Sequence, residues 1–393
     1  MSSYLLNEFL FSIDEEYIQP HYLKETQSNF IVNNSLRYYL TEIKMEIDKY
    51  PEKWEQFKKI TNKYEYINTS CVLEKHKLNT CVCSYKPISR SYFKMIEILH
   101  YFKFNFPSNM SSFHLAEGPG GFIEALQKFR NNKKDSYTGM TLIDDDKDVP
   151  KWNKIQNYIK QHPEIHLEYG PHRDGNLYYR HNLKYIFENH KNKYNFVTAD
   201  GGFDYSVDFN KQEENSVNLI FCETLYALIL QKEGGSFVLK VFDIFHKTTL
   251  EIIYLLCYFY NQVYVFKPHT SREANSERYI VCKDFRKKTN YENIIKQLMS
   301  GFYDLSKQKL SSIFNYDLNN FYLSKIQEIN AIYGQQQVEN ILLTLNYIHD
   351  SNNNKDKIEK IKHNNVEKCI KWCKEHNQAV AIVLQDLNCC LHN

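Results

Sequence analysis

The stretch FHLAEGPGGFIEALQKF, from Phe113 to Phe129, decides the fold that the sequence predicts. Its apolar start runs into the glycine-rich turn GPGG at 118–121, and apolar residues then recur three or four apart, as on one face of a helix. A strand, a tight glycine turn and a helix in this order typify the cofactor-binding start of an α/β sheet. The stretch therefore predicts such a sheet and raises the question of which cofactor the turn would hold.

The composition of the turn argues against a bound pyrophosphate. It lacks the G-x-G-x-x-G spacing of dinucleotide-binding proteins, and Pro119 has no amide hydrogen to donate to a phosphate. A ligand without phosphate, approached closely by glycine backbone, fits the turn better, and S-adenosylmethionine is such a ligand. A tight turn with a purely structural purpose is the alternative.

Apolar runs alternate with helical patterns from about residue 85 to 285, which indicates a mostly parallel sheet. Four runs are predicted as strands: NFVTAD (195–200), GGSFVLKVFD (234–243), VYVF (263–266) and RYIVC (278–282). Between the first two, SVNLIFCETLYALILQKEGG predicts a helix that ends at Gly234 and Gly235. Residues 1–84 and 287–393 have mainly helical patterns, and a low-complexity segment at 350–357 is predicted to be mobile.

The composition limits the partners and the compartment. The 393 residues carry a formal net charge of only +2, so phosphate contacts would have to come from a local basic surface. The ten cysteines, without a secretory signal in the first ten residues, predict reduced thiols in a cytosol-like compartment. The sequence predicts no membrane span and no metal, although Cys369, Cys373 and His376 resemble half of a zinc site.

Two charged residues end strands that are otherwise apolar. Asp200 ends NFVTAD, and Lys240 lies near the end of SFVLK. Ligands of open α/β sheets bind beyond the carboxyl ends of the strands, so both side chains are expected in one crevice. Burying charges without a purpose is costly, which favours a functional role. The alternative is a plain buried ion pair.

Two further segments bring charged residues to the same unit. The loop KPHTSREANSERYIVC at 267–282 places Ser271, Arg272 and Glu277 just before a strand. Lys94 interrupts the apolar face of the predicted helix within ISRSYFKMIEIL, residues 88–99. Considered alone, Lys94 would be interpreted as solvated surface.

Taken together, these elements resemble FtsJ-like RNA ribose 2′-O-methyltransferases. Their Lys-Asp-Lys-Glu tetrad is matched, in order and on the corresponding elements, by Lys94, Asp200, Lys240 and Glu277. The sequence is most similar to enzymes of eukaryotes and large DNA viruses that methylate the first transcribed nucleotide of capped mRNA. The segments that carry the similarity include ADGGF (199–203), GGSFVLKVFDIF (234–245) and KPHTSREANSERYIVCK (267–283).

The resemblance implies an architecture. It implies a Rossmann-like S-adenosylmethionine-dependent methyltransferase sheet, of class α/β, with helical additions at both termini. The predicted domains are a helical N-terminal extension (1–84), the FtsJ-like methyltransferase domain (85–286) and a helical C-terminal region (287–393).

The resemblance also implies a reaction. The methyl group of S-adenosylmethionine would pass to the ribose 2′-OH of the first transcribed nucleotide, forming cap 1. Lys240 would act as general base steered by Asp200, while Lys94 and Glu277 would hold the 2′-OH. A lysine base needs a pKa lowered towards neutrality; burial and Lys94 act in that direction, and the two carboxylates act against it.

Further residues are assigned to the ligands by the same resemblance. The expected contacts of S-adenosylmethionine are Glu117, Gly118, Pro119, Gly120, Gly121 and Phe122, with Asp174 and Asn176 from an adenosine-binding loop at 169–179. A surface turn built on Asp-Gly is the alternative for that loop. Ser271 and Arg272 are expected to contact RNA. The sequence departs from the family at His114, where most relatives have Asp, and at Ser89, where cap enzymes often have Asn.

The sequence leaves two other functions as alternatives. One is 2′-O-methylation of ribosomal or transfer RNA, and the other is a non-catalytic RNA-binding subunit of a capping complex. The expected partners are the capped mRNA 5′ end and other capping enzymes or an RNA polymerase, without a membrane. The predicted location is the cytoplasm, a viral factory or a virion, and the sequence does not exclude the nucleus.

Overall fold

The structure is a computed structural model. It describes residues 3–7, 11–23, 32–73, 78–146, 149–202, 209–302, 305–350 and 355–382. Half of the segment predicted to be mobile, residues 351–354, and Phe203 of the ADGGF segment lie outside the described residues.

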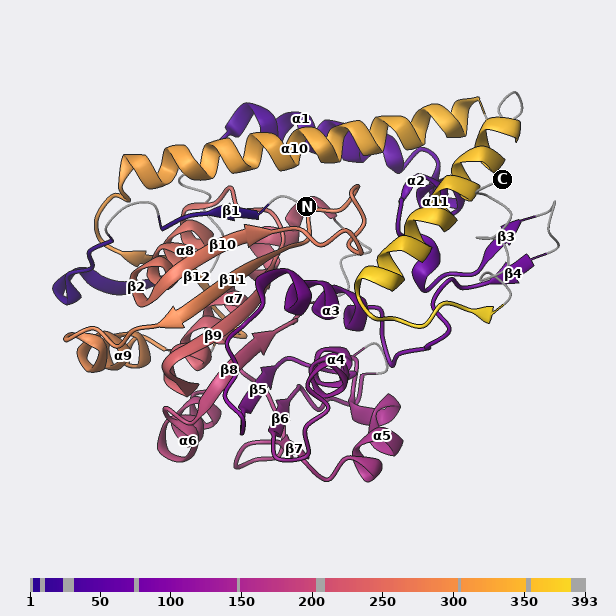
Figure 1. The fold of residues 1–393 in the computed structure, drawn as a ribbon. Coiled ribbons are helices and arrows are strands. Elements are labelled where there is room, and N and C mark those ends of the chain that lie inside the picture. Colours follow the sequence, from indigo (N-terminus) through magenta and orange to yellow (C-terminus); the bar gives the residue numbers. More distant parts are fainter. Residues whose placement is uncertain are drawn as a thin grey trace. The chain divides into compact units, whose positions relative to one another are not determined.

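An eight-stranded mixed sheet forms the centre of the first unit (Figure 1). From one edge to the other its strands are β1 (Ser3–Leu5), β10 (Tyr260–Phe266), β11 (Arg278–Phe285), β9 (Gln231–Val241), β8 (Tyr194–Ala199), β5 (Ser111–Leu115), β6 (Ser136–Met140) and β7 (Ile165–Glu168). Strands β9, β8, β5, β6 and β7 run parallel, and β11, β10 and β1 add antiparallel pairs. The α/β class predicted from the alternating pattern is confirmed.

Helices alternate with these strands along the chain: α4 (Gly121–Arg130), α5 (Gln156–Gln161), α6 (Arg180–His190), α7 (Gln212–Leu230) and α8 (Lys247–Phe259). Strands covered on both faces need apolar residues at nearly every position. The centre of β8 meets this need, because Phe196, Val197 and Ala199 are all fully buried. The strand runs predicted at 195–200, 263–266 and 278–282 therefore correspond to β8, β10 and β11.

The order of the strands reverses direction between β5 and β8. The chain proceeds from β5 outward to β6 and β7, then returns to the other side of β5 with β8. Ligands of open α/β sheets bind beyond the carboxyl ends of the strands at such a switch point. The last residues of the two strands, Leu115 and Ala199, are register partners. The segments that follow them, which contain the glycine turn and Asp200, therefore start side by side.

Gly234 and Gly235 lie inside strand β9, so the prediction that they end a helix is wrong: α7 ends at Leu230. The pairing of β8 with β9 shifts register here, which marks an irregularity of the bulge type. A Cβ on Gly235 would lie 2.8 Å from the carbonyl oxygen of Asn195, and Gly234 has φ of +75°. The glycines therefore serve the close approach of two strands.

The remaining elements come from both flanks and from the segment before β5. They are the strands β2 (Ile18–Leu23), β3 (Cys71–Leu73), β4 (Leu78–Thr80) and β12 (Lys309–Phe314), and the helices α1 (Asn34–Ile47), α2 (Pro51–Thr61), α3 (Ser91–Phe102), α9 (Tyr291–Ser300), α10 (Asn320–His349) and α11 (Lys355–Glu375). Short strands thus accompany the predicted helices in both flanks. None of the described helices is both long and apolar enough to cross a membrane.

Contacts group the chain into two units of three segments each, and the predicted domain boundaries at 84 and 286 stay a prediction. The first unit comprises Met1–Ser35, Lys103–Lys267 and Glu277–Ala331. The second comprises Leu36–Phe102, Pro268–Ser276 and Ile332–Asn393. The second unit therefore takes in the loop between β10 and β11 as well as parts of both flanks.

Candidate active site

The register of the parallel strands places Asp200 beside Lys240. Ala199 is the partner of Leu239, so each charged residue directly follows a paired one. The Lys240 Nζ donates to the backbone carbonyl oxygen of Asp200 at 2.7 Å and lies 3.2 Å from its carboxylate Oδ1. The crevice expected from the sequence therefore brings these two side chains together.

Tyr279 joins Glu277 to this pair. In the antiparallel pairing of β11 with β9, Tyr279 is the register partner of Lys240. Its hydroxyl lies 3.2 Å from Asp200 Oδ1 and 3.3 Å from Glu277 Oε1, within hydrogen-bond distance of both. Tyr279 is fully buried, and burial together with these two carboxylates raises its pKa well above the usual value. It therefore remains a neutral donor.

The charge environment of Lys240 contains one carboxyl more than the sequence interpretation counted, that of Glu223. Burial alone would lower the pKa of Lys240, but the carboxylates of Asp200, Glu277 and Glu223 outweigh burial and raise the pKa above the usual value of a lysine. The two carboxylates named from the sequence therefore act in the expected direction. In this environment Lys240 is an ammonium ion.

Glu223 is a buried carboxyl that the sequence interpretation missed. It lies on α7, is fully buried, and its Oε1 accepts the amide hydrogen of Gly201 at 3.1 Å. A Cβ on Gly201 would meet that oxygen at 2.2 Å, so a larger residue here would displace the Glu223 carboxyl. Burial raises the pKa of Glu223 to about 8, with Lys240 opposing and Asp200 adding to the rise. The position of Glu223 in the mostly apolar run LIFCETLYALIL, residues 219–230, was a signal for a buried carboxyl, but it does not show what the carboxyl faces.

Lys94 belongs to the second unit, on helix α3, as predicted from the amphipathic pattern. Its neighbours Phe93 and Met95 are buried. The structure thus brings together Asp200, Lys240 and Glu277 within the first unit. The part of Lys94 in the tetrad stays a prediction.

The glycine turn after β5 is organised by Glu117. Its Oε1 accepts the amide hydrogens of Phe122 at 2.7 Å and Ile123 at 3.0 Å, in the first turn of α4. A carboxylate therefore occupies the helix terminus that would otherwise attract a phosphate. The other oxygen, Oε2, is buried and has no hydrogen-bond partner among the described residues. This arrangement suits a ligand with a cationic group and without phosphate there.

The glycines of the turn also serve the packing of the protein itself. A Cβ on Gly118 would lie 2.1 Å from the carbonyl oxygen of Pro150, and one on Gly120 would lie 2.2 Å from Ile155 Cδ1. Gly120 also has φ of +115°, which L-residues rarely adopt. The turn thus has a structural purpose, which was the alternative that the sequence left open. Contact of a cofactor with the residues of the turn stays a prediction for Gly118, Pro119, Gly120, Gly121 and Phe122.

His114 forms hydrogen bonds within the central sheet. Its Nδ1 lies 2.7 Å from Thr198 Oγ1 and its Nε2 lies 2.9 Å from Ser112 Oγ, so both ring nitrogens are engaged. Burial lowers the pKa of His114 to about 3, and the ring is therefore neutral. Glu117, unlike His114, therefore keeps a buried polar side-chain atom without a partner among the described residues.

Asp174 and Asn176 hold the loop that was assigned to adenosine. Asp174 Oδ1 accepts the Asn176 amide at 2.8 Å and the side-chain amide of Asn182 at 2.6 Å. Asn176 Oδ1 accepts the Tyr178 amide at 2.9 Å. These bonds are those of a turn stabilised by its own side chains. Contacts of Asp174 and Asn176 with a cofactor stay a prediction.

The two residues assigned to RNA differ in their surroundings. Ser271 is buried, and its hydroxyl donates to Asn275 Oδ1 at 3.3 Å within the loop. Arg272 instead forms a bidentate ion pair with Glu65, through distances of 2.9 and 3.0 Å. Both side chains therefore have partners within the protein, and contact of Ser271 and Arg272 with RNA stays a prediction.

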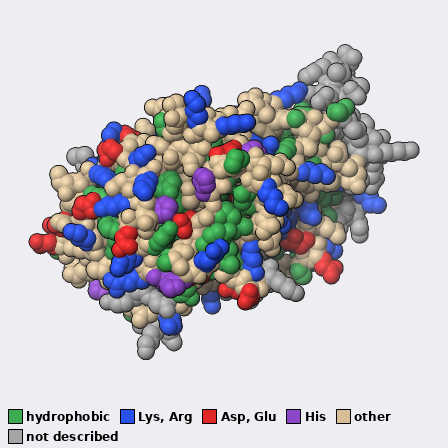
Figure 2. All heavy atoms as spheres, turned by 90° about the horizontal axis from the view of Figure 1, so that it is seen from below, with side chains coloured by type: hydrophobic (Ala, Val, Ile, Leu, Met, Phe, Trp, Pro, Cys, Tyr) green, Lys and Arg blue, Asp and Glu red, His purple; other side chains and the backbone are tan. Residues whose placement is uncertain are grey.

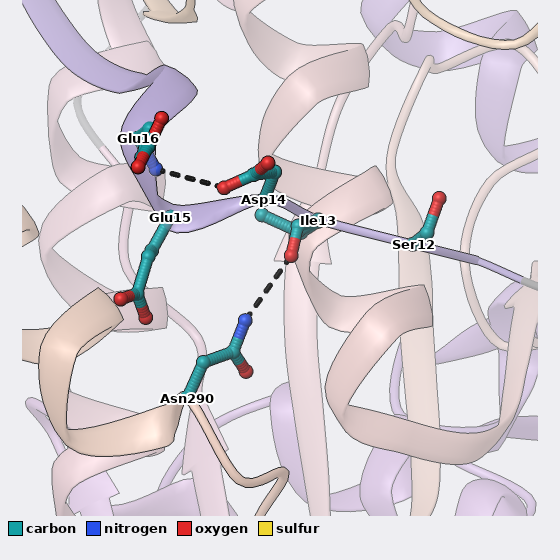
Figure 3. A pocket seen from close by; sticks show the side chains of 6 residues that line it. All are labelled: Ser12, Ile13, Asp14, Glu15, Glu16 and Asn290. Carbon is teal, nitrogen blue, oxygen red and sulfur yellow. Dashed lines mark hydrogen bonds between the residues drawn. The ribbon is translucent and has the colours of Figure 1, made fainter.

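A hollow of about 450 Å³ lies elsewhere on the first unit, lined by Ser12, Ile13, Asp14, Glu15, Glu16 and Asn290 (Figure 3). Its polar groups bind one another: Asn290 donates to the Ile13 carbonyl oxygen, and Asp14 accepts the Glu16 amide. Within the described residues no cluster of His, Cys, Asp or Glu could hold a metal ion, and the eight described cysteines form no disulfide.

Known proteins resemble this chain as follows. A cap-specific mRNA (nucleoside-2′-O-)-methyltransferase 2 of Danio rerio is 28% identical over 334 residues, covering 78% of this chain and 42% of that protein. A cap-specific mRNA (nucleoside-2′-O-)-methyltransferase 1 of Drosophila melanogaster is 32% identical over 212 residues, covering 51% of this chain and 26% of that protein. A cap-specific mRNA (nucleoside-2′-O-)-methyltransferase 1 of Mus musculus is 36% identical over 178 residues, covering 43% of this chain and 20% of that protein. The chain thus spans less than half the length of each of these relatives.

The model of the FtsJ-like methyltransferase family matches residues 87–285. This span holds β5 to β11, with the switch point and all four residues of the predicted tetrad. Since it covers just over half of the chain, the protein belongs to the FtsJ-like methyltransferase family.

Proposed function

We propose that this chain methylates the ribose 2′-OH of the first transcribed nucleotide of capped mRNA, with S-adenosylmethionine as methyl donor. The observation that carries the proposal is the cluster of Asp200, Lys240 and Glu277 at the switch point of the sheet. The relatives named as cap-specific 2′-O-methyltransferases support the choice of substrate. Other capping enzymes or a polymerase as partners, and a reducing compartment, belong to the same proposal.

The residues around the glycine turn fit this donor. S-adenosylmethionine supplies an electrophilic methyl group on a sulfonium and carries an ammonium group but no phosphate. Glu117 would hold the ammonium through its buried Oε2, while its Oε1 keeps the start of α4 in place. Burial raises the pKa of Glu117 well above the usual value, so a cation that binds there would cause the carboxyl to release its proton.

The tetrad residues would prepare the 2′-OH for in-line attack. A ribose hydroxyl is weakly acidic, so removing its proton as the bond forms and fixing its direction both accelerate transfer. Lys240 is placed for this task, because Asp200 fixes its Nζ from two sides. Glu277, next to the Tyr279 hydroxyl, would orient the 2′-OH together with Lys94.

Lys240 can accept a proton only if its pKa falls in the assembled complex. The three carboxylates of Asp200, Glu277 and Glu223 hold the pKa above the usual value of a lysine in the first unit. Added positive charge opposes this effect, and the complex would supply it through Lys94 and the bound sulfonium. The proposal therefore makes Lys240 a base of the full complex, whereas in the unliganded protein it is an ammonium ion.

Methyl transfer to RNAs that differ only at their 5′ end tests the proposal. Tritiated S-adenosylmethionine is incubated with the protein and with RNA bearing a triphosphate, an unmethylated cap or an N7-methylated cap. We expect label in the 2′-O-methylated first nucleotide of capped RNA, lost in Lys240→Ala and kept in Lys232→Ala, an exposed lysine of the same strand. Equal transfer to uncapped RNA would indicate ribosomal or transfer RNA. Cofactor binding without any transfer would indicate a non-catalytic subunit.

A further inference from the structure

Asn330 is a polar residue in the core of the first unit, on helix α10, and lies outside the span of the family match. Its side chain is fully buried. Its Oδ1 accepts a hydrogen from Arg278 Nη1 at 2.8 Å, and its Nδ2 donates to the carbonyl oxygen of Ile244 at 2.8 Å. Because a guanidinium group only donates and a carbonyl oxygen only accepts, these two partners fix which way the amide points. One side chain therefore bridges two segments of the catalytic sheet.

Both bridged segments adjoin residues of the proposed tetrad. Arg278 directly follows Glu277 and begins β11, and Ile244 lies four residues after Lys240, just beyond the end of β9. In the sheet, Arg278 is the register partner of Val241, the last residue of β9. The bridge therefore joins the start of β11 to the segment that leaves β9, directly beside the strand ends that carry Glu277 and Lys240.

The bond between Asn330 and Arg278 satisfies a buried charge. Arg278 is 1% exposed, and burying a cation is costly unless hydrogen bonds or an opposite charge compensate it. The ion pair of Arg278 with Asp243 spans 4.0 Å, which is beyond hydrogen-bond distance. The short bond to Asn330 therefore helps to fix the direction of the guanidinium group, and with it the start of β11.

The segment that leaves β9 is also held by other elements of the first unit. Glu213 on α7 accepts the amide hydrogens of Phe245 and His246 at 2.9 Å each. The amide of Val32 donates to the carbonyl oxygen of Phe245 at 3.0 Å. Val32 comes from the N-terminal flank and Asn330 from the C-terminal flank, so both flanks hold this segment. Of these contacts, the one made by Asn330 also reaches β11.

The exposed surface gives no comparable indication of what the flanks contribute. On the face drawn in Figure 2, basic and acidic side chains of the described residues are interspersed. The buried bridge at Asn330 is a more specific feature, because both of its bonds end next to the proposed tetrad.

We propose that Asn330 is a positioning residue for methyl transfer, which holds the start of β11 against the segment after β9 and so fixes Glu277 relative to Lys240. The inference rests on the proposed function and assigns part of it to the C-terminal flank. A misplacement of about 1 Å, caused by a change outside the reacting groups, can lower a rate about 100-fold. A bridge that ends one residue from Glu277 and four from Lys240 is close enough to have such an effect.

Two substitutions of similar size to asparagine test the bridge, with whichever RNA the wild type methylates. Asn330→Asp keeps an acceptor for Arg278 but has no hydrogen for the Ile244 carbonyl oxygen, and Asn330→Leu removes both bonds. We expect kcat to fall about 10- to 100-fold in each variant, while KM for RNA and Kd for S-adenosylmethionine stay within about threefold of wild type. Since the new carboxylate of Asn330→Asp faces Arg278, this variant should keep its Tm within a few degrees of wild type.

Asn218 on α7 supplies the matched control, because it is another buried asparagine that bridges segments of the first unit. Its Nδ2 donates to the carbonyl oxygens of Leu305 and Gln308 at 2.8 and 2.7 Å, and its Oδ1 accepts the Leu310 amide at 2.9 Å. Asn218→Asp and Asn218→Leu should lower Tm at least as much as the Asn330 variants and leave kcat unchanged. Equal losses of kcat at both positions would indicate reduced stability instead of positioning and would overturn the inference.

The reactivity of the Lys240 amine gives a measurement that does not depend on methyl transfer. The carboxylate of Glu277 is among those that raise the pKa of Lys240, so a looser Glu277 should lower that pKa and increase the fraction of free amine. Labelling with acetic anhydride, quantified by mass spectrometry against the exposed Lys232, follows this fraction. We expect Lys240 to react about two- to fivefold faster in Asn330→Asp than in wild type, and at the wild-type rate in Asn218→Asp.

The possible results separate the bridge from the proposed function. Wild-type kcat in Asn330→Asp would overturn the bridge, because the bond to Arg278 alone would then suffice. Wild-type kcat and unchanged labelling in Asn330→Leu would overturn the inference as a whole and leave the proposed function intact. If the wild type methylates no RNA but Lys240 reacts faster in the Asn330 variants, the proposed function fails while this inference stands. If labelling is unchanged as well, both fail.

Discussion

The Lys240 ammonium donates to the backbone carbonyl oxygen of Asp200 at 2.7 Å and lies 3.2 Å from the carboxylate of the same residue. The main-chain bond does not depend on the charge of the carboxylate. The direction of the lysine is therefore set by the end of strand β8 as well as by the ion pair. A change at Asp200 should alter the charge of the site more than the position of Lys240.

The pH dependence of methyl transfer should report the proton on Lys240. Because its pKa is raised above the usual value of a lysine, the free base is scarce at pH 7, and its population rises with pH. We expect the single-turnover rate at saturating cofactor and capped RNA to rise about tenfold per pH unit until the pKa of the complex is reached. A rate that stays constant from about pH 5 to pH 9 would mean that Lys240 acts only as an ammonium ion.

Tyr279→Phe should lower the rate without disturbing cofactor binding. The substitution removes the hydroxyl that lies between Asp200 and Glu277, and with it the single hydrogen that the two carboxylates share. We expect kcat to fall about 10- to 100-fold, the effect of losing a hydrogen bond to a charged group. The control is Tyr291→Phe, a buried tyrosine whose hydroxyl donates to the Leu228 carbonyl oxygen at 3.0 Å. It should lose stability but keep kcat; equal losses of kcat would contradict the role of Tyr279.

Glu223→Gln should change how stability depends on pH. The pKa of Glu223 is raised to about 8, so between pH 4.5 and 8 the folded protein holds a proton that the unfolded chain has released. Stability then falls as pH rises through this window, by at most about 1.4 kcal/mol per unit for this group. Glutamine keeps an acceptor for the Gly201 amide without titrating, so the variant should gain in Tm over wild type from pH 6 to 8. A constant difference in Tm would show that Glu223 is ionised throughout.

Glu117→Gln should weaken binding of S-adenosylmethionine by removing the carboxylate while keeping an acceptor for the amides of α4. We expect Kd to rise about 10- to 100-fold, the loss of a buried charge pair. In wild type, binding should release a proton, because the pKa of Glu117 is raised well above the usual value. Calorimetry in buffers of different ionisation enthalpy measures this proton. Glu213→Gln is the control, since Glu213 is a buried carboxyl that also accepts two backbone amides, those of Phe245 and His246.

The sequence predicted the parts of the site that interrupt apolar strands. Asp200 and Lys240 were recognisable because a charge in a buried strand is costly, and parallel register then brings both together. The helix boundary near Gly234 was wrong because a glycine that ends a helix and one that forms an irregularity in a strand look alike in sequence.

Contacts between residues far apart in the chain could not be predicted from the sequence. Glu65 and Arg272 are separated by 207 positions, and no spacing rule connects them. The carboxylate of Glu223 lies within a buried helix, where only the fold shows that it faces the turn after Asp200. The effect of the carboxylates on Lys240 likewise depends on how many of them surround one ammonium.

The two units alternate along the chain, and this affects how the protein can be cut into fragments or recombined with related proteins. The chain passes between the units five times, so a cut at any single point divides at least one of them. A fragment limited to residues 87–285, the span of the family match, would keep Lys94 and Arg272 but lose Glu65 and most of the unit to which all three belong. The catalytic sheet and its flanks are therefore not interchangeable modules, and we expect recombination to transfer them together.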